Sequence, residues 1–178
     1  MFIGTFVFAL KLVCTAFAFA LLLRAYLRYL CFPLNDRLNG LMSRATDWAI
    51  TPASKFIPTI KNISYPSLFV CYLTAIVYKF FFWLVGDGTF GLYSIFVGSA
   101  VLVLYWAVEL SIFMALAYCL SSWIGQGFSS YRILGMLTDP YLGIFRKYIP
   151  PYKNIDLSAI VFFVIGSVIS GVLWKFVG

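Results

Sequence analysis

Two stretches of the sequence, TDWAITPASKFIPTIKNIS at residues 46–64 and TDPYLGIFRKYIPPYKNID at residues 138–156, repeat one polar pattern. The second copy begins 92 residues after the first, and the two align without a gap. Each copy opens with Thr-Asp and continues through Lys-aromatic-Ile-Pro to Lys-Asn-Ile. A gapless repeat of this length, placed between apolar runs, is typical of a duplicated membrane hairpin.

Composition indicates that the apolar runs around this repeat lie in lipid. The 178-residue chain is 63% hydrophobic and 11% charged, whereas a soluble domain is about half apolar and a quarter charged. About 20 mostly apolar residues cross the hydrocarbon layer. Four stretches have that length: residues 2–23, 65–85, 90–120 and 157–177. We therefore expect an all-α membrane protein with four transmembrane helices, built as two parallel helical-hairpin repeats, residues 1–88 and 89–178.

The basic residues predict which side of the membrane the repeated pattern faces. Ten of the thirteen lie at or within the connections between the first and second spans and between the third and fourth: Arg24, Arg28, Arg37, Arg44, Lys55, Lys61, Arg132, Arg146, Lys147 and Lys153. The positive-inside rule assigns both connections to the cytoplasm, so we expect an inner-membrane protein with both termini in the periplasm. A basic membrane face predicts contact with anionic lipid headgroups rather than with nucleic acid.

Each of these connections is expected to contain two short interfacial helices. Between Leu38 and Ala49, apolar residues recur at three- and four-residue spacing, which is typical of an amphipathic helix at the headgroup boundary. A second helix is expected to begin at Thr51-Pro52 and, in the other copy, at Asp139-Pro140, because a capping side chain followed by proline favours a helix start. Pro58 and Pro150-Pro151 are expected to end these helices.

An ordered set of motifs resembles the YggT family of membrane proteins. The set comprises Ser122-Trp123, Leu137-Thr138-Asp139-Pro140, Arg146-Lys147 with Ile149-Pro150, and Ile155-Asp156-Leu157-Ser158. The resemblance covers nearly the whole chain, although Gly143-Ile144-Phe145 stands where the family usually has a proline before the basic pair. It implies a membrane protein of the bacterial inner-membrane or plastid type. Its relatives are associated with osmotic tolerance, cell division or nucleoid placement, and assembly of membrane complexes.

One group of candidate functional residues lies at the connections. These residues would contact a membrane-protein partner or lipid: Arg24, Asp47, Thr138, Asp139, Pro140, Arg146, Lys147, Pro150 and Asp156. Simpler interpretations exist, because an aspartate near a helix start satisfies backbone N–H groups and a basic pair at a membrane surface binds lipid phosphates. Arg24 is expected either to extend to the interface or to pair with an acidic residue of the repeats.

A second group of candidates lies inside the predicted spans. A carboxylate in the membrane is costly unless it is paired or protonated, so Glu109 is a functional candidate. The repeat offset places it level with Phe17, within side-chain reach of Lys11 or Arg24. Two roles are open for Glu109: it forms a structural ion pair between the first and third spans, or it is a residue of an ion path. Lys79 in the second span raises the same question.

The residue inventory disfavours catalysis. The chain has no histidine, and its four cysteines form no C-x-x-C pair, so we expect no enzyme activity, cofactor or metal. The favoured function is a non-enzymatic scaffold, assembly or accessory partner of another membrane complex, acting through its cytoplasmic repeat face. The alternative is a small ion-permeation or osmoprotective protein that uses Glu109. Because four helices fill their own interior with side chains, a pore would require a homo-oligomer or an unusual gap between the helices.

Overall fold

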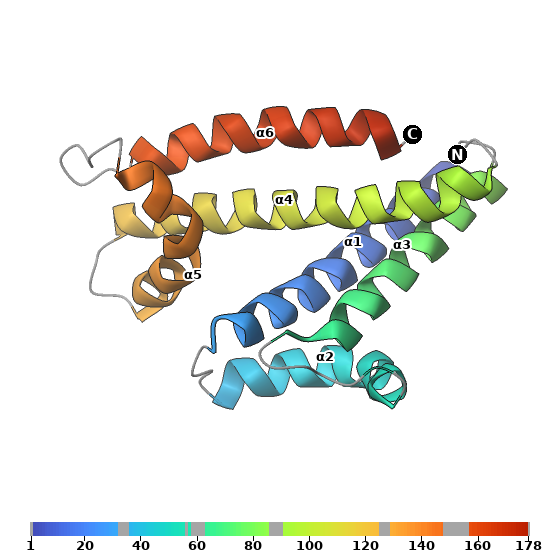
Figure 1. Cartoon of the computed structure of the whole chain (residues 1–178), viewed down its shortest axis with the longest axis horizontal. Coiled ribbons are helices and arrows are strands. Elements are labelled where there is room, and N and C mark those ends of the chain that lie inside the picture. The colour runs from blue at the N-terminus through green and yellow to red at the C-terminus, as the bar shows by residue number, and fades with distance from the viewer. Residues whose placement is uncertain are drawn as a thin grey trace. The chain divides into compact units, whose positions relative to one another are not determined.

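The protein is built from α-helices, as predicted. The computed structural model describes residues 2–31, 36–55, 57, 63–85, 91–124, 129–147 and 157–177. Six helices lie within these ranges: α1 Phe2–Tyr29, α2 Asp36–Ser54, α3 Tyr65–Leu84, α4 Leu92–Ile124, α5 Ser129–Arg146 and α6 Leu157–Val177 (Figure 1). Helices α1, α3, α4 and α6 correspond to the four predicted spans, while α2 and α5 lie in the two polar connections.

Four helices are long and apolar enough to cross a membrane, which confirms a multi-pass membrane protein. Their apolar segments are Thr5–Tyr29, Tyr65–Leu84, Ser94–Ser121 and Ser158–Val177. Large apolar side chains are exposed along them, including Phe8 at 67% and Phe113 at 64%, as expected for surfaces that face lipid. The segments in α1 and α4 contain 25 and 28 residues, longer than the roughly 20 needed, so these helices tilt or project from the bilayer.

In the described part of each connection, one helix runs through the proline at which a second short helix was expected to begin. Pro52 lies within α2 and Pro140 within α5. Proline removes a backbone N–H and crowds the carbonyl four residues earlier, which kinks a helix without always ending it. The Thr51 hydroxyl donates to the Asp47 carbonyl at 2.5 Å, one residue before the Trp48 carbonyl that Pro52 leaves without its usual helical donor. In Figure 1 the last turn of α2 is seen nearly end-on while the rest runs across the page.

The helices group into two compact units. The first comprises Met1–Trp106 with Trp174–Gly178, and the second comprises Ala107–Leu173. These units differ from the sequence repeats because α4 begins in the first unit and ends in the second. The proposed repeat boundary between residues 88 and 89 falls outside the described residues.

In the first unit, α1 and α3 pack along each other and α2 lies against both (Figure 1). Small side chains at the α1–α3 contact, those of Ala18, Cys71 and Ala75, are fully buried. Helices approach closely where small residues face one another, which is the usual basis of helix packing in membranes. The Tyr72 hydroxyl donates to the Phe96 carbonyl at 3.0 Å, joining α3 to the start of α4.

The second unit contains the remainder of α4, all of α5 and most of α6. Its core consists of Ala115, Tyr118, Leu142 and Ala159, which bring the three helices together. Gly166 allows α6 to approach α4, because a Cβ at this position would lie 2.7 Å from Ile112 Cγ1. Both units therefore hold a polar-connection helix against membrane-spanning helices.

Candidate functional site

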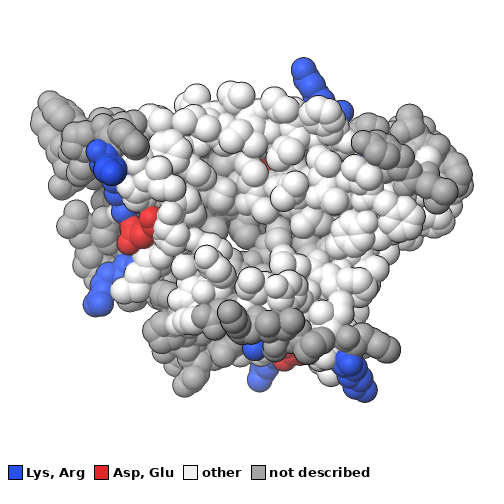
Figure 2. Space-filling model, in the orientation of Figure 1, with Lys and Arg blue, Asp and Glu red and all other residues white. Residues whose placement is uncertain are grey.

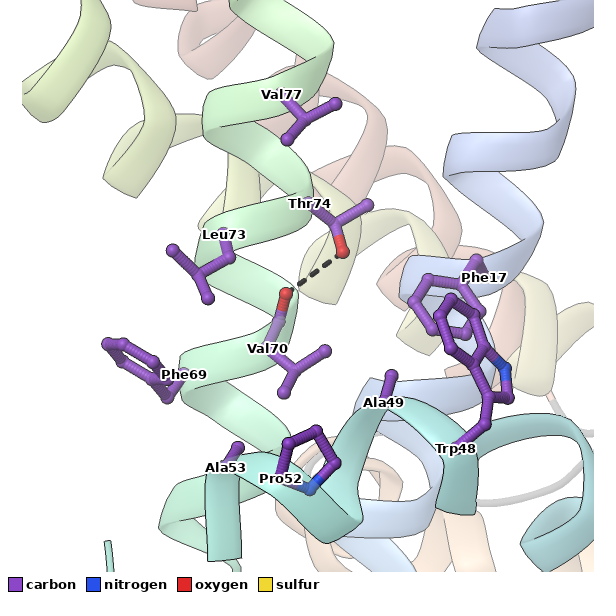
Figure 3. Close-up of a pocket in the computed structure, with 10 residues that line it drawn as sticks. All are labelled: Phe17, Trp48, Ala49, Pro52, Ala53, Phe69, Val70, Leu73, Thr74 and Val77. Atoms are coloured by element: carbon purple, nitrogen blue, oxygen red, sulfur yellow. Dashed lines mark hydrogen bonds between the residues drawn. The ribbon is translucent and has the colours of Figure 1, made fainter. Parts of the chain in front are cut away.

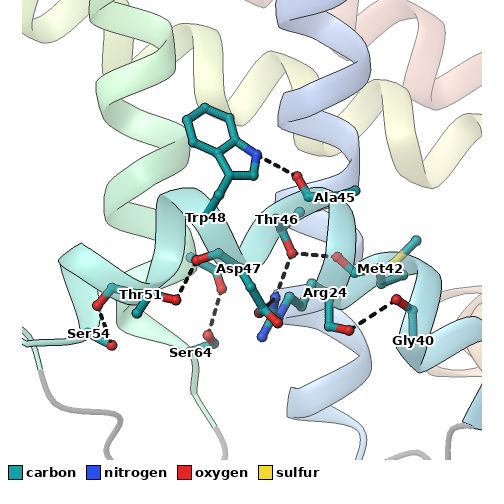
Figure 4. Close-up of polar contacts among 12 residues, drawn as sticks. Arg24, Gly40, Met42, Ala45, Thr46, Asp47, Trp48, Thr51, Ser54 and Ser64 are labelled. Atoms are coloured by element: carbon teal, nitrogen blue, oxygen red, sulfur yellow. Dashed lines mark hydrogen bonds and ion pairs between the residues drawn. The ribbon is translucent and has the colours of Figure 1, made fainter.

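Arg24 joins the end of α1 to α2. Its Nη1 donates to Thr46 Oγ1 and to Asp47 Oδ1, each at 2.6 Å (Figure 4). Thr46 is fully buried, and its hydroxyl also donates to the Met42 carbonyl at 2.6 Å. The threonine oxygen thus accepts one hydrogen bond and donates another, so it is satisfied in an apolar setting. One guanidinium fixes α2 on α1 by contacting two consecutive residues.

The second repeat also pairs its aspartate with an arginine, but the arginine comes from another element. Arg146, the last residue of α5, donates to Asp139, seven residues or about two turns earlier in the same helix. The Arg146 guanidinium lies 5.2 Å from the centre of the Tyr118 ring in α4, a cation–π distance. Thr138, fully buried like Thr46, donates to the Leu134 carbonyl at 2.9 Å.

At the 92-residue offset, the arginines that bind the two aspartates do not occupy matching positions. The position that matches Arg24 is Leu116, and the position that matches Arg146 is Ser54. The buried threonine and the aspartate are retained, while the cation reaches the carboxylate from α1 in one unit and from α5 itself in the other. Both arrangements hold the connection helix to a spanning helix, through a hydrogen bond in one case and a ring contact in the other.

The interpretation of the aspartates as helix-start residues is wrong. Asp47 and Asp139 lie in the interiors of α2 and α5, more than two turns from either helix start. Backbone N–H groups in a helix interior already bond within the helix, so these carboxylates have none to cap. They bind arginine instead.

The other candidates at the connections have simpler environments. Pro140 is exposed within α5, and Lys147 is exposed directly after its end. Pro150 and Asp156 lie outside the described residues, as does Pro58. Figure 2 shows that the described charged side chains visible in this view lie mainly over α2 and α5, whereas the surfaces of the long helices are largely uncharged.

Lys79 is held by polar groups inside the first unit. Its Nζ donates to Ser94 Oγ at 3.4 Å and to the Val177 carbonyl near the end of α6. Gly98 makes room for this lysine, because a Cβ there would collide with the Lys79 ammonium. The lysine thus joins α3 to the start of α4 and to the end of α6.

Glu109 is half-buried within α4. The two ion pairs found among the described residues are those of Arg24 with Asp47 and of Arg146 with Asp139. Lys11, the other suggested partner, has its ammonium 5.0 Å from the centre of the Trp174 ring. A role for Glu109 in an ion pair or an ion path stays a prediction.

An apolar pocket of about 520 Å³ lies in the first unit and was not predicted. Helix α2 forms its floor with Trp48, Ala49, Pro52 and Ala53, and the facing sides of α1 and α3 form its walls (Figure 3). A comparison of side-chain size at matching repeat positions could have predicted it, because alanines of α2 match aromatic residues of α5.

Comparison with known proteins agrees with the duplicated architecture. The profile of the CCB3/YggT family matches the chain twice, over residues 3–85 and 97–177. The chain belongs to the CCB3/YggT family. Each match lies within one predicted repeat, which confirms the tandem duplication.

CCB3/YggT relatives align over most of this chain. The uncharacterized protein YggT of Escherichia coli strain K12 is 26% identical over 159 residues, 89% of this chain and 83% of its own length. A Vibrio alginolyticus protein from the region 3′ of proC is 26% identical over 148 residues, 80% of this chain and 79% of its own. The uncharacterized protein ycf19 of Guillardia theta is 46% identical over 44 residues, 25% of this chain and 45% of its own. No solved structure matches.

The described part of this CCB3/YggT protein presents two ion pairs and extensive apolar surface. No cluster of three or more His, Cys, Asp or Glu side chains that could hold a metal occurs among the described residues. Cys14 and Cys71 are thiols buried within spanning helices.

Proposed function

We propose that this CCB3/YggT protein is a non-enzymatic scaffold that binds another membrane complex through α2 and α5 and supports its assembly. A scaffold needs a surface of fixed orientation, because ordering a loose segment on binding lowers affinity. The contact of Arg24 with both Thr46 and Asp47 carries the proposal, because it fixes the rotation of α2 about its own axis.

The exposed side chains of the two connection helices have a composition that suits protein recognition. On α2, Trp48 is 71% exposed and Arg44 is exposed near it. On α5, Met136 and Ile144 are 49% and 63% exposed. Tryptophan, methionine and arginine are enriched in protein interfaces, where apolar contact area is combined with directed hydrogen bonds.

The proposed location is the bacterial inner membrane, with both connections in the cytoplasm and both termini in the periplasm. Each connection follows an odd number of spans, so membrane crossings alone would place both on the same side. The basic residues of the connections favour the cytoplasm for that side. Anionic headgroups would then meet the exposed basic residues Arg28, Arg44 and Lys147.

Site-specific photocrosslinking in cells tests the scaffold proposal. A photoreactive amino acid at Arg44 of α2 or at Met136 of α5 should give a discrete adduct with another membrane protein, which mass spectrometry can identify. Val168, 63% exposed on the spanning helix α6, is the matched control. The same adduct from Val168, or no adduct from either connection helix, would contradict the proposal.

The alternative function, ion permeation, rests on the half-buried Glu109 within α4. A purified protein that conducts ions should give flux in liposomes, and Glu109→Gln should abolish that flux while the protein inserts normally. The scaffold proposal predicts background flux for both proteins. Flux that depends on Glu109 would favour the alternative.

A further inference from the structure

The apolar pocket of the first unit is lined almost wholly by hydrocarbon. Its one polar lining side chain besides the Trp48 indole is that of Thr74, whose hydroxyl donates to the Val70 carbonyl at 2.9 Å (Figure 3). The indole Nε1 of Trp48 donates to the Ala45 carbonyl at 2.9 Å, within its own helix. Both groups are satisfied by the protein, so the pocket offers shape and apolar contact but no directed hydrogen bond.

The second repeat carries larger side chains at three of the positions that match lining residues of the pocket. Ala49, Ala53 and Val70 line the pocket, and the residues at matching positions are Tyr141, Phe145 and Phe162. The Phe162 ring lies 4.8 Å from the Tyr141 ring and 5.7 Å from the Phe145 ring, measured between centres. Three small lining residues of the pocket thus match members of an aromatic cluster, while the lining residues Phe17, Trp48 and Phe69 match the smaller Glu109, Pro140 and Val161. The lining residues Trp48, Leu73 and Val77 are 71%, 43% and 49% exposed, so the pocket opens to the surface and is accessible to an occupant from outside the chain.

The size of the pocket restricts what can occupy it. A volume of about 520 Å³ lies within the range of ligand sites, and it would hold only about one turn of an α-helix with a diameter near 10 Å. A partner's spanning helix would therefore enter the pocket with only about one turn of its length. The pocket suits a narrow hydrocarbon chain, which the surrounding bilayer supplies.

Basic side chains flank the pocket along α2. Arg44 lies one helical turn before the lining residue Trp48, and Lys55 follows the lining residue Ala53 by two positions. Both side chains are exposed, and the Asp47 carboxylate between them is bound to Arg24. The rim therefore carries positive charge that is not neutralised by that carboxylate.

We propose that this pocket binds one acyl chain of an anionic phospholipid whose phosphate lies between Arg44 and Lys55. A lipid tail in the bilayer is already out of water, so retention depends on filling the void and on attraction at the headgroup. Binding should therefore favour anionic over zwitterionic phospholipid. This inference goes beyond the proposed scaffold function and does not depend on it.

A pocket-filling variant tests the acyl-chain site. The triple substitution Ala49→Tyr/Ala53→Phe/Val70→Phe introduces the aromatic residues found at the matching positions of the second repeat. In native mass spectrometry from mild detergent with phosphatidylglycerol, the wild type should retain one phospholipid and the variant none. Ala100→Phe, at an exposed position of α4, is the control and should retain it. A filled variant that keeps the lipid would overturn the proposal, as would a wild type that keeps none.

Neutral substitutions at the rim test the headgroup site. Arg44→Gln and Lys55→Gln should each weaken phosphatidylglycerol binding about fivefold and leave phosphatidylcholine binding unchanged. Equal loss for both lipids, or no loss for either, would overturn the assignment of the anionic headgroup. A peptide or partner segment recovered in the pocket in place of lipid would overturn the whole proposal.

Fluorescence quenching keeps the proposal testable if the triple variant does not fold. Phosphatidylglycerol with brominated acyl chains, added at near-equimolar amounts in detergent, should quench Trp48 because the indole lines the pocket. The quenched part of the emission should be missing from Trp48→Phe. Equal fractional quenching of the wild type and Trp48→Phe would show that the chain binds elsewhere, and would overturn the proposal.

Discussion

Nη1 of Arg24 in α1 lies 2.6 Å from Oδ1 of Asp47 in α2, although 23 positions separate the two residues in the chain. The same Arg24 nitrogen also donates to the buried Thr46 hydroxyl. This pair of contacts links a membrane-spanning helix to the helix of the polar connection, and it gives the repeated Thr-Asp pattern a structural role.

Removal of the arginine should loosen α2. We predict that Arg24→Gln lowers the free energy of unfolding by about 1 kcal/mol, because partly exposed ion pairs contribute at most about that much. Asp47→Asn should have a similar effect, and the double variant should lose less than the sum of the two. Thermal unfolding in detergent measures these changes. Arg28→Gln, an exposed change in the last turn of α1, is the control and should be close to neutral.

The position of the arginine should be exchangeable between the repeats. Arg146→Ser copies the residue of the first repeat and should destabilise the second unit by about 1 kcal/mol, since Asp139 loses its partner. Adding Leu116→Arg places an arginine where the first repeat has Arg24, and we predict that it restores most of the lost stability. Melting temperatures of the single and double variants provide the measurement. A double variant less stable than Arg146→Ser alone would show that the repeats do not share this geometry.

Gly166 should be necessary for the packing of α6 on α4. Gly166→Ala places a methyl group 2.7 Å from Ile112 Cγ1, so we predict a loss of about 1–3 kcal/mol from overpacking. Gly171→Ala is the matched control, because no atom lies within 4 Å of its Cβ. Alanine favours the helix by up to about 1 kcal/mol over glycine, so the control should be neutral or stabilised. Thermal unfolding of both variants distinguishes steric clash from a general effect of glycine replacement.

The exposed thiol of Cys31 tests the proposed orientation. Cys31 directly follows the last turn of α1, at the connection that we assign to the cytoplasm. A membrane-impermeant maleimide should label it in inside-out vesicles but not in intact spheroplasts. Cys119, a partly buried thiol in α4, is replaced by serine so that it does not contribute. Labelling of intact spheroplasts would place this connection in the periplasm.

The sequence predicted the membrane-spanning helices because apolar character adds up over the many residues of a span. Apolar composition over about 20 residues is enough to identify a span, and all four were found. The repeat offset likewise identified matching positions, and the family profile matches both copies. These features depend on long segments, so single residues such as Arg24 or Lys79 inside the spans did not obscure them.

Features set by tertiary packing could not be predicted in the same way. The prolines at 52 and 140 have the local sequence of helix starts, but α2 and α5 are continuous through them. The sequence left Arg24 either to extend to the interface or to pair with an acidic residue. The fold shows that it pairs with Asp47. The apolar pocket depends on the sizes of side chains from three helices, although the alanines at 49 and 53 and their aromatic counterparts were visible in the repeat.

The central claim is that a fixed α2 presents a docking surface for another membrane protein. Photocrosslinking from Arg44 in the wild type and in Arg24→Gln, at matched membrane levels, tests it most directly. The account predicts a discrete adduct with one membrane protein in the wild type, and a yield several-fold lower when α2 is released from α1. The absence of any adduct, or an equal yield in Arg24→Gln, would contradict it.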